Sequence, residues 1–318
     1  MDFWEKILNQ AFIIGLLAST IRVATPLLLA GLGEIFSERS GVLNVGIEGL
    51  MLIGAVGGFL GSYYTHSPWL GALIGMLAAG AIGLIHAWLS ITLGADQVVS
   101  GIAINILSLG LATFVNRAAF GVYTSPPKAS GFPIISIPVL VDIPVVGPIL
   151  FQHYALVFIA LVLVPVCYVV IFKTMLGLKI TAVGENPRAA ETAGVNVHAV
   201  RYLCVLLGAV LAGLAGTALS LGQLNMFRET MIAGRGFIAI AVVMFGRWNP
   251  VGALGAALLF GLAEATQIRL QALGVTAVPP QLLVSLPYLV TLIVVLSSAG
   301  RAITPRALCV PYVRRDGR

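Results

Sequence analysis

The stretch QHYALVFIALVLVPVCYVVIFK, from Gln152 to Lys173, carries no charged side chain before its final lysine. A helix of this length spans roughly 30 Å, the thickness of the hydrocarbon core of a membrane. In lipid every backbone polar group needs an internal partner, which an uninterrupted apolar run finds only as a helix. Further apolar runs lie on both sides, at about 7–34, 44–64, 68–93, 97–120, 198–222, 235–246, 250–272 and 280–299. The sequence therefore predicts an all-α, polytopic transmembrane helical bundle with about eight to nine spans.

The composition agrees with this fold class. Of the 318 residues, 59% are hydrophobic and only 9% are charged. A soluble domain carries about a quarter charged residues, so this chain cannot cover itself with polar surface. The net charge of +6 comes from scattered basic residues and a basic tail, and it does not indicate a nucleic-acid partner. We expect residues 1–318 to form one domain that is surrounded by lipid in a cell (inner) membrane.

Lysine and arginine residues indicate which loops face the cytoplasm. If the basic tail 300–318 lies inside and the chain crosses nine times, the loop 174–197 also lies inside. The loop 121–150 then lies outside the cytoplasm; it is rich in proline and has one lysine and one aspartate, which predicts an extended, braced segment. This arrangement places the amino terminus outside. The tail arginines are Arg301, Arg306, Arg314, Arg315 and Arg318.

The run 235–246 is too short for a comfortable crossing. We expect it to be re-entrant or to extend into residues 229–234. Small residues four apart, such as Ala212 with Gly216, predict that the helices of the bundle approach one another closely.

The stretch AVGENPRAAETAGVNV (Ala182–Val197) interrupts the apolar pattern with a short charged segment. Asn186 suits a helix N-cap, Pro187 the first helical position and Gly194 a left-handed stop, which together predict a helix of about two turns. A helix this short is marginal in water, so its own loop or a partner must hold it. Two interpretations remain open: a self-contained loop helix, or a docking element that transmits motion between a soluble machine and the bundle.

Three stretches resemble a known protein family. KITAVGENPRAAETAGVNV (Lys179–Val197) resembles the cytoplasmic coupling loop of ABC-importer permeases of the branched-chain amino acid, simple-sugar and nucleoside group. GEIFSERSGVLNVGIEGLMLIGAV (Gly33–Val56) resembles the amino-terminal signature of the sugar and nucleoside branch. GRGFIAIAVVMFGRWNPVGALGAALLFG (Gly234–Gly261) is similar to its carboxy-terminal signature. The stretches keep the order of the family, and the resemblance spans nearly the whole chain.

The resemblance implies a permease subunit of an ATP-driven importer for a neutral polar solute, with nucleosides first and simple sugars such as ribose next. It implies three partners: an ABC ATPase subunit, a second permease subunit, either identical or different, and an extracytoplasmic substrate-binding lipoprotein. The sequence contains no G-x-x-x-x-G-K-[ST] phosphate loop. We therefore expect no enzymatic activity and no cofactor in this chain, with ATP and Mg²⁺ on the partner ATPase. The implied ATPase-coupling residues are Glu185, Asn186, Pro187, Arg188, Ala189, Ala190, Glu191 and Gly194.

The run 97–120 carries its neutral polar side chains on one face. They fall within about 100° of one another at 100° per residue, and polar groups in a span usually face the bundle or a water-filled cavity. Neutral groups suit an uncharged, hydroxyl-rich solute, although hydrogen bonding between helices is the alternative. The candidate substrate-pathway residues, including two from the start of the run 44–64, are Asn44, Glu48, Gln97, Asn105, Ser108 and Asn116.

Arg22, Glu48 and Glu264 are charged residues that fall within predicted spans. An ionised side chain at mid-membrane costs a few kcal/mol or more, so each needs a partner or water. Arg22 and Glu48 form one candidate ion pair. A fixed structural pair and a role in substrate passage both remain open.

Glu34, Glu38 and Arg39 belong to the first family-like stretch. We expect them at the cytoplasmic boundary of the membrane. There they either support the ATPase contact or form a solvated interfacial cluster.

Catalytic and metal chemistry find little support. Each histidine stands alone, without H-E-x-x-H spacing, and no G-x-S-x-G elbow occurs. Cys167, Cys204 and Cys309 are far apart, which indicates packing thiols and no metal site. The rival function is a secondary transporter or channel that uses Arg22, Glu48 and Glu264 as coupling sites.

Overall fold

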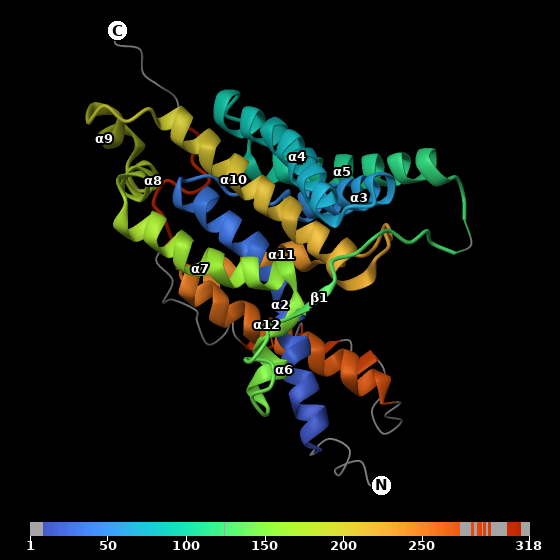
Figure 1. Ribbon diagram of the computed structural model, residues 1–318. Coiled ribbons are helices and arrows are strands. Elements are labelled where there is room, and N and C mark those ends of the chain that lie inside the picture. The colour runs from blue at the N-terminus through green and yellow to red at the C-terminus, as the bar shows by residue number, and fades with distance from the viewer. Residues whose placement is uncertain are drawn as a thin grey trace.

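Long helices make up most of the chain in the computed structural model, which describes residues 9–123, 125–273, 281–282, 285–287, 289–290, 292–293 and 304–312. They pack side by side in one bundle, and the two strands form a single small sheet (Figure 1). The elements are α2 (Gln10–Arg39), α3 (Ile47–Thr65), α4 (Pro68–Ala87), η1 (Trp88–Thr92), α5 (Gln97–Phe120), β1 (Ile134–Ser136), α6 (Val146–Leu150), β2 (Gln152–Tyr154), α7 (Ala155–Lys173), α8 (Met175–Glu185), α9 (Pro187–Thr192), α10 (Val197–Thr217), η2 (Ala218–Leu224), α11 (Arg235–Phe245) and α12 (Pro250–Ala272).

Within the described residues, 7 helices are long and apolar enough to cross a membrane. They coincide with seven of the predicted runs, and two of them end in a wider helical turn, η1 after α4 and η2 after α10. The run 235–246 forms the shorter helix α11. The run 280–299 lies mostly outside the described residues. The all-α polytopic fold is confirmed, and the predicted span number stands as an approximation.

Asn/Ser–Pro pairs start two of the long helices. Ser67 Oγ accepts from the amide of Leu70, and Asn249 Oδ1 accepts from the amide of Val251. The following residue is proline in each case, which needs no hydrogen-bond partner for its nitrogen at the first helical position. α4 and α12 therefore begin where local chemistry dictates.

Small residues let α3 and α10 touch backbone to backbone. A Cβ added to Gly216 would lie 1.8 Å from the carbonyl oxygen of Met51, and one added to Gly54 would lie 2.3 Å from that of Gly213. Packing of this kind replaces the hydrophobic driving force, which is absent between helices in lipid. The close approach predicted from the spacing of small residues is present.

One end of the bundle gathers α8, α9 and residues 304–312, and we call it the α9 end (Figure 1). α2 ends here, because its last residue, Arg39, donates to Thr181 Oγ1 on α8 at 3.4 Å; Arg39 also donates to the carbonyl oxygen of Trp248 at 2.8 Å. The described part of the tail also lies here, since Arg306 Nε is 3.8 Å from Glu185 Oε2. The loop 174–197 and the described tail thus share one end.

The proline-rich loop 121–150 lies at the opposite end, which we call the loop end. It folds back on the bundle, because the amide of Phe132 donates to the carbonyl oxygen of Leu221 at the end of α10 and η2. Ser62 Oγ on α3 also donates to the carbonyl oxygen of Ser130. β1 pairs antiparallel with β2, which leads directly into α7. The loop is therefore braced, with a short strand and the short helix α6 within it.

Two parts of the chain follow the same order in opposite directions. In the first part α2 is followed by a non-helical segment, α3 and α4; in the second, α10 and η2 are followed by residues 225–234, α11 and α12. α2 ends at the α9 end, whereas α10 begins there. α12 packs on α2, and α4 packs on α10 in the same way. The starts of α3 and α11 meet inside the bundle, where Glu48 contacts Gly234 and Gly236.

Candidate functional site

α9 is held by the local signals that its sequence carries. Asn186 Oδ1 accepts from the amide of Ala189 at 3.1 Å, and Pro187 is the first helical residue. Gly194 has φ +83°, a left-handed conformation that other residues rarely adopt. Ala190 is buried and anchors the inner side of the helix to the bundle. The short helix predicted for this loop is thus present, over Pro187–Thr192.

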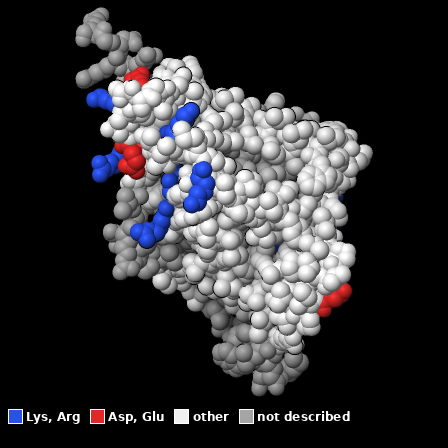
Figure 2. Space-filling view, turned by 60° about the vertical axis from the view of Figure 1, so that its left-hand side comes forward, with Lys and Arg blue, Asp and Glu red and all other residues white. Residues whose placement is uncertain are grey.

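Most of the predicted coupling residues line the outer surface of this segment. Glu185, Asn186, Arg188, Ala189 and Gly194 are exposed, whereas Pro187 and Glu191 are partly buried. Figure 2 shows that charged side chains gather at this end of the molecule, while most of the remaining surface in that view is uncharged. The α9 end therefore offers water a small, polar, projecting surface.

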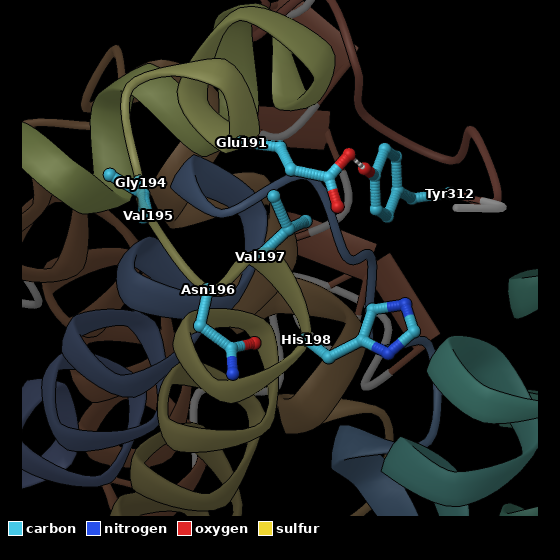
Figure 3. A pocket seen from close by; sticks show the side chains of 7 residues that line it. All are labelled: Glu191, Gly194, Val195, Asn196, Val197, His198 and Tyr312. Atoms are coloured by element: carbon cyan, nitrogen blue, oxygen red, sulfur yellow. Dashed lines mark hydrogen bonds between the residues drawn. The ribbon is translucent and has the colours of Figure 1, made fainter. Parts of the chain in front are cut away.

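A hollow of about 300 Å³ lies between α9, the start of α10 and the tail (Figure 3). Its side chains come from Glu191 on α9, from residues 194–198 and from Tyr312. The hydroxyl of Tyr312 donates to the carboxylate of Glu191, and the ring of Tyr312 meets that of His198 edge to face at 5.8 Å. The tail thus closes one side of the hollow.

The tail segment 304–312 runs across the α9 end as a strap. The amide of Ala307 donates to the carbonyl oxygen of Gly184 at 2.8 Å, at the end of α8. Arg201 on α10 donates to the carbonyl oxygens of Ser40 and Val310. These bonds connect α8, α10 and the end of α2 through one segment. Sequence reasoning identified only the basic charge of the tail and missed this strap.

The polar face of α5 turns toward the loop between α2 and α3. Gln97 Oε1 accepts from the amide of Leu43 at 2.8 Å. Asn105 both accepts from the amide of Gly49 and donates to the carbonyl oxygen of Val45. The side chains share one face as the spacing predicts, and two of them hydrogen-bond to neighbouring backbone. The alternative that the sequence left open, bonding between segments, accounts for Gln97 and Asn105.

Three further candidate polar residues are buried and have side-chain polar atoms without a hydrogen-bond partner among the described residues. Asn44 and Ser108 are fully buried, and their side-chain polar atoms have no hydrogen-bond partner among the described residues. Asn116 Nδ2 donates to the hydroxyl of Tyr123 at 2.9 Å, and its Oδ1 accepts no bond from any described residue. Buried polar groups are normally satisfied, and these three side chains depart from that rule among the described residues.

Glu48 joins the two helices that begin inside the bundle. Its Oε1 accepts from the amide of Gly234 at 2.8 Å, and its Oε2 accepts from the amide of Gly236 at 2.7 Å. The first amides of a helix have no partner within the helix, and their dipoles favour a negative charge. α11 is about 16 Å long at 1.5 Å per residue and ends near Trp248 at the α9 end. The start of α11, which is capped by the carboxylate of Glu48, therefore lies near the middle of the bundle.

The predicted pair of Arg22 with Glu48 is wrong. Arg22 Nη2 donates to Ser19 Oγ on its own helix, while both oxygens of Glu48 are occupied by α11. Glu264 on α12 pairs with Arg235, whose guanidinium also donates to the carbonyl oxygen of Met231. Charge patterns along the sequence could not reveal these partners, because folding brings them together from distant segments.

Glu34 and Glu38 do not form a solvated interfacial cluster. Both are buried: Glu34 Oε1 accepts from the amide of Asn44, and Glu38 Oε2 accepts from Trp248 Nε1. Arg39 is partly buried, with its guanidinium 4.7 Å from the centre of the Phe172 ring. The cluster fastens the end of α2 to its neighbours.

Residues 16–303 match the family described as the permease component of the branched-chain amino acid transport system. The chain belongs to this permease family. All three family-like stretches of the sequence lie inside the matched range. The permease family and the apolar helices together make the chain a multi-pass membrane protein.

Three relatives from this permease family cover nearly the whole chain. A Haloferax volcanii protein, TsgC13, provisionally named a glucose ABC transporter permease, is 40% identical over 96% of this chain and 99% of its own length. The guanosine ABC transporter permease NupQ of Bacillus subtilis is 40% identical over 93% of this chain and 95% of its own. The nucleoside ABC transporter permease NupC of Lactococcus lactis is 36% identical over 94% and 96%. No solved structure matches the chain.

These relatives occur in pairs. Bacillus subtilis also has the guanosine permease NupP, 29% identical over 81% of this chain, and Lactococcus lactis has the nucleoside permease NupB, 28% identical over 83%. Members of this permease family thus come in two kinds in one organism, each named as an ABC transporter permease.

Proposed function

We propose that this chain is a permease subunit of an ATP-driven importer for nucleosides in the cell (inner) membrane. The observation that carries the proposal is α9, a capped and exposed helix at the charged end of a membrane bundle of the permease family. Two of the relatives that cover nearly the whole chain are named for guanosine and nucleosides. The sequence has no phosphate loop, so a partner ATPase binds ATP and Mg²⁺, and this chain is a transport subunit without enzymatic activity.

The contacts of the α9 end support a route for motion from the ATPase into the bundle. The ATPase docks on the exposed surface of α9, which faces the cytoplasm. α8 directly precedes α9 in the chain and contacts Arg39. The guanidinium of Arg39 donates to Thr181 on α8 and to the carbonyl oxygen of Trp248. Trp248 stands in the turn between α11 and α12. A displacement of α9 therefore reaches the short helix that starts in the middle of the bundle.

In this proposal the gate is the non-helical segment 225–234, which precedes α11. Transporter sites commonly lie where discontinuous helices begin at mid-membrane. Residues 225–234 are non-helical, and the Glu48 carboxylate binds the amides of Gly234 at their end and of Gly236 in the first turn of α11. The same carboxylate would be a coupling site in an ion-driven carrier. Its two helix-capping bonds, and the pairing of Glu264 with Arg235, favour fixed structural roles instead.

The paired relatives support a second, different permease as the partner of this chain. Two permeases then enclose the pathway, two ATPases drive it, and an extracytoplasmic binding lipoprotein delivers the solute. The identity to TsgC13 makes a simple sugar the second candidate substrate.

Uptake by reconstituted vesicles tests the proposal. Vesicles that contain the permease pair, the ATPase and the binding protein are expected to accumulate labelled guanosine only with ATP, and ionophores that collapse ion gradients leave uptake unchanged. Labelled glucose in parallel decides between the two substrates. Uptake that persists without ATP and stops with the ionophores would overturn the importer in favour of the secondary carrier.

A further inference from the structure

A second, larger cavity lies at the loop end, away from α9. It has a volume of about 600 Å³, within the range of small-molecule sites. The end of α5 forms one wall, the start of the loop 121–150 a second, and the broken segment 225–234 a third. The polar side chains that line it are those of Asn116, Arg117, Tyr123, Arg228, Glu229 and Thr230.

The lining offers hydrogen-bond donors and acceptors side by side. Arg117 Nε lies 3.4 Å from Glu229 Oε1, with the Arg117 side chain 61% and the Glu229 side chain 37% exposed, so water or a ligand can compete for both groups. Arg228 adds a second guanidinium. A surface pair of this kind contributes little to stability, which leaves it free to exchange partners.

Asn116 points to a ligand independently of these charges. Its side chain is only 2% exposed, and its Oδ1 has no hydrogen-bond partner among the described residues. Its amide nitrogen donates to the hydroxyl of Tyr123, another wall residue. A buried carbonyl oxygen without a partner is unfavourable, so an occupant that donates a hydrogen bond there stabilises the complex.

The cavity is connected to the gate through one short segment. Glu229 and Thr230 belong to residues 225–234, and the same segment ends at Gly234 on the carboxylate of Glu48. Phe227 in this segment is buried and packs near Phe59 of α3. A molecule that fills the cavity therefore contacts the segment that must move when α11 moves.

We propose that this cavity is a solute-selecting site of the permease itself and that it takes a purine nucleoside; this rests on the proposed import function. Guanidinium groups recognise the acceptor edge of guanine, and a carboxylate accepts from its N–H groups, so Arg228 or Arg117 with Glu229 suits a purine edge. The ring of Tyr123 provides a stacking surface for the base. Asn116 Oδ1 accepts from a hydroxyl or amine. A hexose has hydroxyl groups but no aromatic face, so it uses fewer of these contacts.

Direct binding of labelled guanosine to the purified permease and ATPase complex, without the binding protein, tests this inference. Saturable guanosine binding is expected, with glucose a weak competitor. Glu229→Gln and Tyr123→Leu are each expected to weaken guanosine binding by roughly tenfold or more. Asp142→Asn removes an exposed carboxylate of the same loop that does not line the cavity, and it is expected to bind guanosine as the parent does.

The outcomes separate this inference from the proposed function. If the parent complex binds no guanosine, or Glu229→Gln binds as tightly as Asp142→Asn, the site is wrong even when ATP-driven guanosine uptake is intact. If uptake proves independent of ATP, the importer itself is wrong. Gel filtration and thermal unfolding of each variant show that lost binding does not reflect lost folding. Asn116→Leu adds a second measure, because it fills the buried position without an acceptor and is expected to weaken guanosine binding.

Discussion

Glu48 shows how one side chain can replace a missing turn of helix. Its two oxygens accept the amides of Gly234 and Gly236, which have no partner of their own inside the bundle. Glu48→Ala leaves both donors without this partner, and the amide of the buried Gly236 alone costs about 1–3 kcal/mol when unpaired. Because 1 kcal/mol shifts the melting temperature by roughly 2–4 °C in chains of 150–250 residues, a drop of several degrees is expected in detergent.

Matched variants sharpen the Glu48 experiment. Glu48→Gln keeps one acceptor and is expected to fall between the parent and Glu48→Ala in melting temperature. Glu185→Ala removes an exposed carboxylate 3.8 Å from Arg306 and is expected to change the melting temperature little. Equal melting curves for Glu48→Ala and Glu185→Ala would contradict the capping role.

Gly216 is a residue whose whole contribution is the absence of a side chain. A Cβ at this position would lie 1.8 Å from the carbonyl oxygen of Met51, so Gly216→Ala must push α10 away from α3. Overpacking costs about 1–3 kcal/mol or more, and a lower yield and melting temperature are expected in detergent. Gly110 on α5 has no atom within 4 Å of such a Cβ, so Gly110→Ala is the control and should melt at the parent temperature or slightly above. A Gly216→Ala protein as stable as Gly110→Ala would refute the close contact.

At the scale of elements, α9 can transmit motion from an ATPase to the bundle only if its outer face binds that partner. Ala189 is exposed on that face, and a larger side chain there leaves the cap at Asn186 untouched. Ala189→Trp is expected to reduce ATP hydrolysis stimulated by the loaded binding protein roughly tenfold, about 1.4 kcal/mol of coupling. Ser136→Trp, at the opposite end of the bundle, should leave it unchanged. Normal stimulated hydrolysis in Ala189→Trp would remove the docking role from α9.

The elements that the sequence predicted best are those governed by local chemistry. The Asn–Pro start of α9 and the glycine that follows it are contiguous, so their consequences do not depend on the rest of the fold. The length of α11 was also evident, because a run of that size cannot cross lipid unaided. The strap 304–312 carries no such signal. Its backbone bonds to the carbonyl oxygen of Gly184 and to the guanidinium of Arg201, which lie in segments far away along the chain.

Only part of the candidate site could be predicted, because most of its contacts join segments that are distant in the sequence. Helical periodicity placed the polar residues of α5 on one face, but it could not name the surface that this face meets, which proved to include the backbone of Leu43, Val45 and Gly49. The partners of Glu48 lie 186 and 188 residues away. The cavity at the loop end combines three segments, so no single stretch of sequence indicated it.

On the scale of the whole molecule, the inverted order of the two parts makes the centre of the bundle special. The start of α11 is capped there by Glu48 of α3, and the two helices run from this point to opposite ends of the bundle. A bundle built from two such parts can open toward either end by small shifts of one part against the other, which is the bistable behaviour that an alternating-access gate requires. The α9 end and the cavity at the loop end then lie on the two sides that the gate separates.

A native thiol can report which end of the bundle faces the cytoplasm. Cys309 is exposed and lies in the strap at the α9 end, whereas Cys167 and Cys204 are buried. Burial raises the pKa of the Cys309 thiol, and nearby carboxylates raise it further. Since only the thiolate reacts with maleimides, labelling should be slower than for a free cysteine at pH 7 and should accelerate as the pH rises past the ordinary thiol range.

If the α9 end faces the cytoplasm, a membrane-impermeant maleimide will not label Cys309 in intact cells and will label it in inside-out vesicles. The rise of labelling with pH shows that a thiolate is the reacting group. A Cys309→Ser, Ser136→Cys variant moves the thiol to β1 at the loop end, and the labelling pattern should invert. Labelling of Cys309 from outside intact cells would show that the bundle has the opposite orientation in the membrane. α9 would then be out of reach of any cytoplasmic ATPase, and the proposed source of energy would fail with it.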